Sequence, residues 1–141
     1  MGYSRYNTKK ISELIKKIGP SDVAFKLDGA WDLSVFYVDR DESKLTIEMC
    51  ASESVNGDMI VDPLMDIELI LDSNGEILEA HPKFYQSQTP LAEIEIYSKD
   101  NPDCWNPELY EKPGQLDEKL SNWLDSIAVQ GYLRAGKIEK I

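Results

Sequence analysis

Three segments of this chain alternate apolar with mostly polar residues, and acidic side chains occupy some of the polar positions, where carboxylates can bind cations. These acids lie in residues 44–50, 65–71 and 91–98 and are Glu48, Asp66, Glu68, Glu93 and Glu95. Alternate residues of an extended strand point to the same face of a sheet, so each segment would place its acids opposite its apolar residues. The five carboxylates therefore predict an acidic sheet face that could bind a basic partner or a cation.

Nucleophilic catalysis has few candidate residues. Such a site would have to combine His81, the only histidine, with a serine or with Cys50 or Cys104. Catalytic triads are defined by geometry, and no spacing pattern joins these residues. Two cysteines and one histidine at scattered positions also lack the paired ligand spacing of a zinc site. The sequence therefore assigns no catalytic residue, no metal ligand and no cofactor, and both thiols are expected to be reduced.

A second kind of chemistry would use carboxylates to hold a metal ion. Asp62, Asp66 and Glu68 are close in sequence and could line a pocket for metal-assisted hydrolysis. Asp62 and Asp66 need not share a face with Glu68, which weakens this hypothesis. A carboxylate-based hydrolase remains an alternative to a binding function.

The elements that would position these acids are mostly strands. Residues 65–71 alternate apolar and polar side chains, and Ser73-Asn74-Gly75 supplies a tight turn after them. Further strands are predicted at 23–27, 33–38, 44–50 and 91–98, with a loop at 51–58. His81-Pro82 is expected to break the strand that follows the turn, before a short pairing at 84–86. Connections this short favour an antiparallel meander of five to six strands.

Two amphipathic helices are predicted at the ends of the chain. Residues 8–18 carry an apolar stripe after Asn7 or Thr8, either of which could cap the helix, and residues 116–131 carry a second stripe that Gly131 would end. The fold class is therefore α+β, one domain over residues 1–141, with both helices packed on one face of the sheet. Residues 132–141 show no pattern, and a flexible tail is one interpretation.

A proline-rich segment at residues 99–114 is longer than most connections within a compact domain. It contains Trp105 and Tyr110, and aromatic anchors of this kind are common at protein interfaces. These two residues join the five acids as predicted partner-binding residues.

Charge is distributed unevenly along the chain and limits the classes of partner. The net charge is −11, made up of +4 in residues 1–20, −17 in residues 21–129 and +2 in residues 130–141. An acidic body repels phosphates and anionic lipid, which argues against direct nucleic-acid or membrane binding. No apolar run is long enough for a membrane span and the start lacks a secretory signal, so a cytoplasmic location is expected.

Three blocks of sequence resemble an uncharacterised family of small bacterial proteins. The blocks are Asn56-Gly57-Asp58-Met59, then Asp62-Pro63-x-Met65-x-Ile67-Glu68, and Trp123-Leu124-x-x-Ile127-x-x-Gln130-Gly131-Tyr132. That family is a domain of unknown function, often encoded near mobile-element genes. The resemblance implies a bacterial origin and transfers no catalytic residue.

These observations favour a non-enzymatic interaction module that binds a basic protein partner. It would use the acidic sheet face together with Trp105 and Tyr110. Two alternatives remain: the carboxylate-based, metal-assisted hydrolase, and a structural homodimer formed by pairing of exposed strand edges. The sequence leaves open whether the protein is a monomer or a homodimer.

Overall fold

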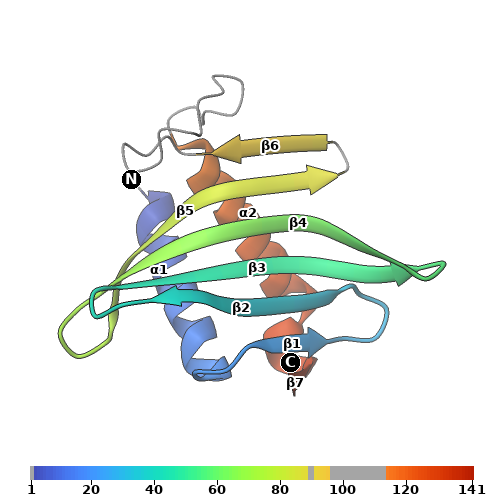
Figure 1. Cartoon of the computed structure of the whole chain (residues 1–141), viewed down its shortest axis with the longest axis horizontal. Helices are drawn as coiled ribbons and strands as arrows, with labels where there is room; N and C mark the ends of the chain where they lie inside the picture. The colour runs from blue at the N-terminus through green and yellow to red at the C-terminus, as the bar shows by residue number, and fades with distance from the viewer. Residues whose placement is uncertain (1, 89–90, 96–113) are drawn as a thin grey trace.

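The protein is an antiparallel sheet with two long helices on one face, as a computed structural model that describes residues 2–88, 91–95 and 114–141 shows (Figure 1). The elements in chain order are α1 (Gly2–Ile18), β1 (Val23–Lys26), β2 (Asp32–Arg40), β3 (Lys44–Val55), β4 (Asp58–Leu71), β5 (Ile77–Gln88), β6 (Leu91–Glu95), α2 (Gln115–Gln130), α3 (Tyr132–Ala135) and β7 (Lys137–Lys140). The strand order is β6-β5-β4-β3-β2-β1-β7. Strands β1 to β6 thus form a meander, which confirms the predicted α+β class.

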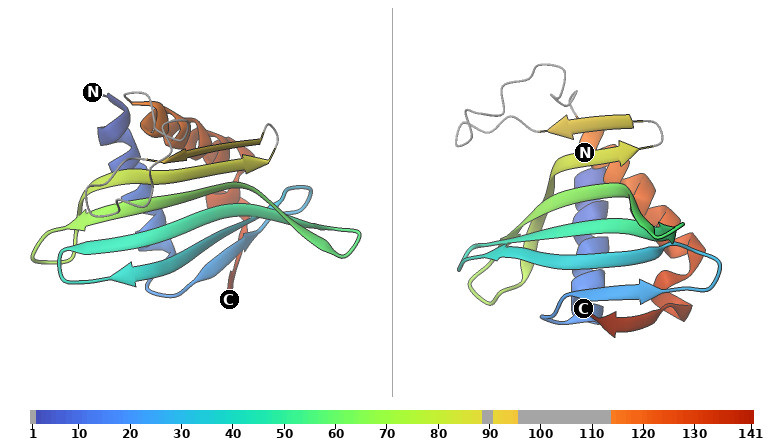
Figure 2. Two further views of the ribbon diagram at one scale, coloured as in Figure 1. Left: turned by 45° about the horizontal axis from the view of Figure 1, so that its top comes forward. Right: turned by 45° about the vertical axis from the view of Figure 1, so that its right-hand side comes forward.

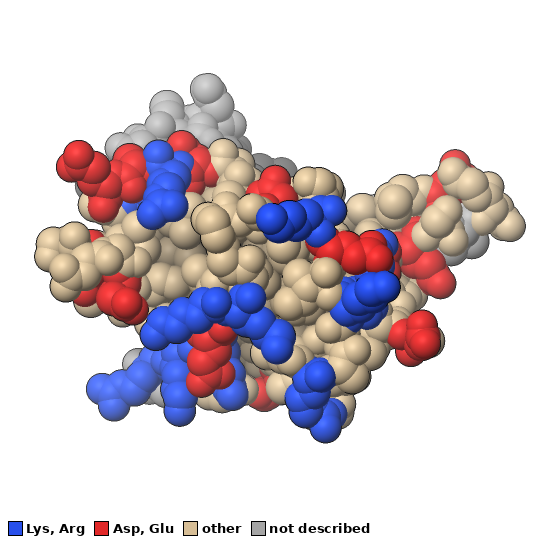
Figure 3. Space-filling model, turned by 90° about the horizontal axis from the view of Figure 1, so that it is seen from below, with Lys and Arg blue, Asp and Glu red and all other residues tan. Residues whose placement is uncertain are grey.

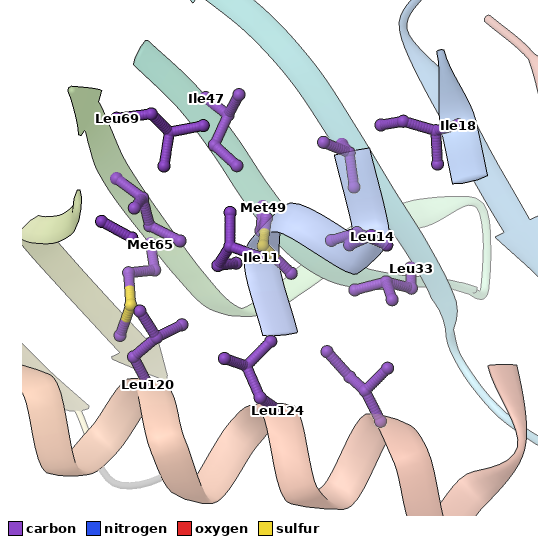
Figure 4. Close-up of a cluster of buried hydrophobic side chains, with 14 of the residues drawn as sticks. Ile11, Leu14, Ile18, Leu33, Ile47, Met49, Met65, Leu69, Leu120 and Leu124 are labelled. Atoms are coloured by element: carbon purple, nitrogen blue, oxygen red, sulfur yellow. The ribbon is translucent and has the colours of Figure 1, made fainter. Parts of the chain in front are cut away.

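The two helices lie side by side across the same face of the sheet in all three ribbon views (Figures 1 and 2). Apolar stripes at the predicted positions account for this, because Ile11 and Leu14 of α1 and Leu120 and Leu124 of α2 are buried against the sheet. Figure 4 shows these side chains facing Met49 and its neighbours on the strands. Helix α2 ends at Gly131, whose φ of 90° is the left-handed conformation that glycine adopts easily.

The hairpin formed by β3 and β4 is longer than the sequence predicted. A loop was expected at 51–58, but β3 continues to Val55 and pairs with Asp58 across a two-residue turn. The turn residues Asn56 and Gly57 have φ values of 52° and 86°, as tight hairpin turns of this kind require. The predicted loop is therefore wrong, because the Asn-Gly pair closes the hairpin directly.

Two prolines lie inside strands where the sequence predicted boundaries. The β3–β4 register shifts between Cys50 and Ser52, where Asp62 and Pro63 lie opposite Ala51. The β4–β5 register shifts between Asp66 and Ile67, directly beside Pro82, which is paired with Ile67. A β-bulge leaves a residue outside the regular hydrogen-bond ladder, so it can hold a residue that has no N–H. Pro63 therefore does not begin β4, and the break expected at His81-Pro82 is wrong.

Helix α1 begins earlier than predicted, at Gly2, so neither Asn7 nor Thr8 is its N-cap. Asn7 is fully buried inside the helix, and its Nδ2 donates a hydrogen bond to the backbone oxygen of Asp117 in α2 at 2.9 Å. The first two turns of α1 pack on α2, and this tertiary contact extends the helix beyond the stripe that the sequence displays.

The last ten residues, for which the sequence predicted no element, form α3 and β7. Strand β7 pairs antiparallel with β1 through four register pairs, from Val23 with Lys140 to Lys26 with Lys137. It adds a seventh strand at the edge next to β1. Within the described ranges, no helix is long and apolar enough to cross a membrane.

Candidate functional site

The sheet surface turned away from α1 and α2 is here called the outer face. Figure 1 views it directly, with both long helices behind it. Cross-strand register places half-buried or buried side chains of β2 to β5 on it, and these include Phe36, Glu48, Cys50, Leu64, Asp66, Glu68, His81 and Phe84. Three of the predicted site residues, Glu48, Asp66 and Glu68, therefore share one face.

Glu48 and Asp66 lie directly opposite each other on β3 and β4. Opposed residues on one face of an antiparallel pair have Cβ atoms only about 5 Å apart, so two carboxylates there repel. Burial, together with the hydrogen bond and the charge of Glu48, raises the pKa of Asp66 from 3.8 to about 6. One carboxyl oxygen of Asp66, Oδ1, is buried without a hydrogen-bond partner. The pair thus lacks a compensating cation among the described residues.

Two phenyl rings flank this carboxyl pair in the same cross-strand row. Phe36 pairs with Glu48, and Phe84 pairs with Asp66. No helix covers this face, and both rings are half-buried, so part of each ring is exposed to solvent. They reduce the hydration of the carboxyls, which contributes to the raised pKa of Asp66. Neither ring was among the predicted site residues, although the alternation of Phe36 with Val35 and of Phe84 with Tyr85 could have placed them on this face.

The remaining predicted site residues are placed in part or not at all. The backbones of Glu93 and Glu95 in β6 pair with Gln86 and Phe84, which continues two outer-face rows. Their side chains lie outside what the structure describes, as do Trp105 and Tyr110. The contribution of the proline-rich segment to a partner-binding surface stays a prediction.

Among the described residues, the structure does not bring His81 and Cys50 together, and Cys104 lies outside what the structure describes. His81 lies opposite Glu68 in the β4–β5 register. Its Nε2 is 2.8 Å from Oε2 of Glu79, so the imidazole is hydrogen-bonded to a carboxylate and not to a thiol or hydroxyl nucleophile. Cys50 lies on β3, two strands away from His81 on β5, and its side chain is buried. Burial and the charge of Glu48 raise the pKa of the Cys50 thiol, which disfavours the nucleophilic thiolate.

The proposed metal-binding carboxylates are also separated. Asp62 accepts a hydrogen bond from the hydroxyl of Ser87 at 2.9 Å and lines a cavity with Trp123 of α2. It therefore faces the helix side, whereas Asp66 and Glu68 lie on the outer face. Within residues 2–88, 91–95 and 114–141, no group of three or more His, Cys, Asp or Glu side chains is arranged to hold a metal ion.

Comparison with known proteins adds no functional assignment. No protein-family model matches the chain, and neither the curated proteins nor the solved structures contain a match. The function must be inferred from the residues of the outer face themselves.

Proposed function

We propose that this protein is a non-enzymatic interaction module that binds a basic protein partner on its outer face. The observation that carries the proposal is the Glu48–Asp66 pair, in which two opposed carboxyls share a partly dehydrated position and one oxygen of Asp66 has no hydrogen-bond donor. A lysine or arginine side chain bound against the pair would neutralise it and donate hydrogen bonds to its accessible carboxyl oxygens. Such charge-assisted bonds are about twice as strong as neutral ones.

The neighbouring rings favour an organic cation over a hydrated metal ion. Phe36 and Phe84 lie beside the carboxyl pair in the same row and keep part of their surface exposed. A guanidinium or ammonium group interacts favourably with a phenyl face, whereas Ca²⁺ and Mg²⁺ require several oxygen ligands. Glu68, in the adjacent row, adds a third carboxylate for the rim of such an interface.

The test is capture of partners from a bacterial lysate on the immobilised protein at about 50 and 500 mM salt, which span weak and strong screening. A basic protein retained at the lower salt and released at the higher salt is the expected result. The variant Glu48→Lys/Glu68→Lys should lose that protein, because it replaces two outer-face acids with cations. Each charge reversal changes the net charge by two units, so the double variant is four units more positive than the original chain.

A matched control separates the outer face from net charge. Glu42→Lys/Asp58→Lys makes the same change in net charge at two exposed residues, one in the β2–β3 turn and one at the start of β4. This variant should keep the partner. If both variants captured it equally well, or if both lost it equally, the outer face would not be the binding surface.

A further inference from the structure

A cavity of about 260 Å³ lies on the helix side of the sheet, where α1 ends. Its walls come from residues 12–20, from the adjoining ends of β2, β3 and β4, and from the β4–β5 turn. The β2–β3 and β4–β5 turns lie next to each other at the left of Figure 1. The volume is just below the usual range for small-molecule sites, about 300 to 1,000 Å³, so the cavity suits a small ligand.

Hydrogen bonds between neighbouring elements hold this cavity in shape. The hydroxyl of Tyr37 in β2 donates to the backbone oxygen of Gly19, directly after α1. The backbone N–H of Tyr37 donates to Oδ1 of Asp22 at 2.8 Å. The N–H of Leu71 in β4 donates to the backbone oxygen of Ser43 at 2.8 Å, which joins the two hairpins. The walls are therefore preorganised, and a ligand would need to order little of the chain.

The inner wall of the cavity is apolar and belongs to the hydrophobic core. Leu45 of β3 and Leu71 of β4 are buried. Ile15 of α1 and Ile77 of β5 are half-buried and pack against the same core. An alkyl or aryl group of a ligand would leave water on contact with these four side chains, and this transfer is favourable.

The charged side chains of the lining have a positive balance. The described part of the lining contains Lys16, Arg40 and Glu76, and all three are exposed. Nζ of Lys16 lies 3.7 Å from Oε2 of Glu76, so these two charges largely offset each other. Among the described residues, no acid forms an ion pair with the guanidinium of Arg40. The lining therefore carries one net positive charge.

The guanidinium of Arg40 acts on the cavity wall itself. Burial raises the pKa of the Tyr37 phenol, and the positive charge of Arg40 opposes part of that rise. The acids of the two neighbouring turns, Asp41 and Asp72, do not line the cavity. Each accepts hydrogen bonds from two backbone N–H groups of its own turn, at 2.8 to 2.9 Å. Arg40 is thus placed to receive an anion at the rim.

The surroundings of the cavity favour an anion although the whole chain has a net charge of −11. Lys16 and Lys17 lie in the last turn of α1 and offset the partial negative charge of the helix C-terminus. Figure 3 shows lysines and arginines gathered on the side where α1 lies. A local cluster of cations raises the concentration of anions near it.

We propose that this cavity binds a small amphipathic carboxylate, with its apolar group against the inner wall and its carboxylate at the guanidinium of Arg40. A guanidinium can donate two parallel hydrogen bonds to one carboxylate. The single net positive charge of the lining favours a monoanion over a phosphate monoester, which carries nearly two negative charges. The cavity and the outer face lie on opposite sides of the sheet, so the proposal does not depend on the function proposed above.

The test follows the backbone N–H signals of Gly19 and Gly75, which line the cavity, by NMR during ligand titration. Hexanoate and benzoate are titrated at constant ionic strength to about 20 mM, a range that detects millimolar affinities. Hexanamide is the neutral control, because it has the shape of hexanoate without its charge. Saturable shifts of both signals with at least one carboxylate are expected, with hexanamide binding about five- to ten-fold more weakly than hexanoate, the range of one charge-assisted contact.

Variants identify the group that recognises the carboxylate. Arg40→Gln should weaken hexanoate binding by the same factor and leave hexanamide binding unchanged, which a general distortion of the cavity would not do. Arg5→Gln makes the same substitution at an exposed arginine of α1 outside the cavity and should leave both affinities unchanged. Glu76→Gln removes the acid from the rim and should tighten hexanoate binding. Thermal unfolding of each variant shows whether the fold is intact.

Each other outcome contradicts the proposal. Equal binding of hexanoate and hexanamide would make the cavity a purely apolar site. Equal hexanoate affinities in Arg40→Gln and Arg5→Gln would remove the role of the guanidinium, and unchanged affinity in Glu76→Gln would remove that of the rim charges. No shift with either carboxylate would mean that the cavity does not bind this class of ligand.

Discussion

Among single residues, Asp66 has the most unusual position in the described structure. Its side chain shares the outer face with Glu48 directly opposite, and its pKa is raised to about 6 by burial first and by Glu48 second. Two like charges at opposed positions of a sheet destabilise it. At neutral pH the folded protein therefore holds an ionised carboxyl in a place that favours the protonated form.

We expect Asp66→Asn to raise the free energy of unfolding at pH 7 by about 1 kcal/mol. Between the ordinary pKa of 3.8 and the folded value of about 6, the folded chain binds more protons than the unfolded chain, so stability falls as pH rises through this window. Above about pH 6 the loss of folding stability is complete and no longer changes with pH. The full shift corresponds to roughly 3 kcal/mol, but Asp66 is only half-buried and water screens part of the repulsion.

Urea unfolding of both proteins at pH 4.5 and at pH 7.5 measures this effect. Asp66→Asn should gain stability relative to the original chain at the higher pH and little at the lower pH, where Asp66 is protonated. Asp58→Asn, at an exposed position of β4, is the control and should show the original pH dependence. An Asp66→Asn variant that kept the original pH dependence would show that this carboxyl does not cause it.

At the scale of elements, α1 is attached to the sheet by a hydrogen bond as well as by its apolar stripe. The N–H of Ala80 in β5 donates to the hydroxyl of Thr8 at 3.1 Å, and Ala80 is fully buried. In the described structure β6 pairs only with residues 84–88 of β5, so this part of β5 has the helix beside it. The Thr8 side chain thus completes the hydrogen bonding of a strand that a helix covers.

Thr8→Val should lower the free energy of unfolding by about 1 to 3 kcal/mol, because it leaves the buried N–H of Ala80 without an acceptor. Chemical denaturation measures the change. Thr8→Ser keeps the hydroxyl and should cost much less. Ser12→Ala removes a hydroxyl that bonds only to its own helix, at the backbone oxygen of Thr8, and should be nearly neutral. Equal losses in Thr8→Val and Ser12→Ala would mean that the bond to Ala80 contributes little.

The elements were largely predictable because alternation and helical stripes are local signals. Met65, Ile67 and Leu69 are all fully buried, as their spacing predicted, and the same parity placed Glu48, Asp66 and Glu68 on the other face. The errors occurred where a non-local contact decides the outcome. Packing on α2 extends α1 to Gly2, and bulges let β4 and β5 continue past their prolines.

At the scale of the whole molecule, sites formed by distant segments could not be predicted. One cavity joins Trp31 and Asp62 to Trp123 and Tyr132 near the end of the chain, and these three segments, tens of residues apart, meet only when α2 crosses the sheet. The distribution of charge over the surface also depends on how distant segments pack together. Exposed Arg5, Lys9, Lys16 and Lys17 belong to α1, and Figure 3 shows lysines and arginines gathered on the side where α1 lies. The acids of the outer face lie on the opposite side of the sheet.

Strand β7 protects one edge of the sheet, and this bears on the association state of the whole molecule. It covers the edge of β1, whose Val23, Ala24 and Phe25 are almost completely buried. Every residue of β7 is exposed, and two of its four residues, Lys137 and Lys140, are lysines. A short, lysine-rich strand is a poor template for pairing with another chain, whereas a bare apolar edge is a good one.

Deletion of residues 137–141 should therefore promote association as well as reduce stability. It removes the four register pairs between β7 and β1 and leaves the backbone groups of residues 23–26 open on one side. Light scattering coupled to gel filtration should show a concentration-dependent rise in mass for the truncated chain relative to the intact chain. Deletion of Ile141 alone keeps all four register pairs and should behave as the intact chain does.

If the truncated and intact chains had the same mass at every concentration, β7 would have no protective role. If the intact chain were already a dimer that truncation turned into a monomer, β7 itself would be the dimer contact.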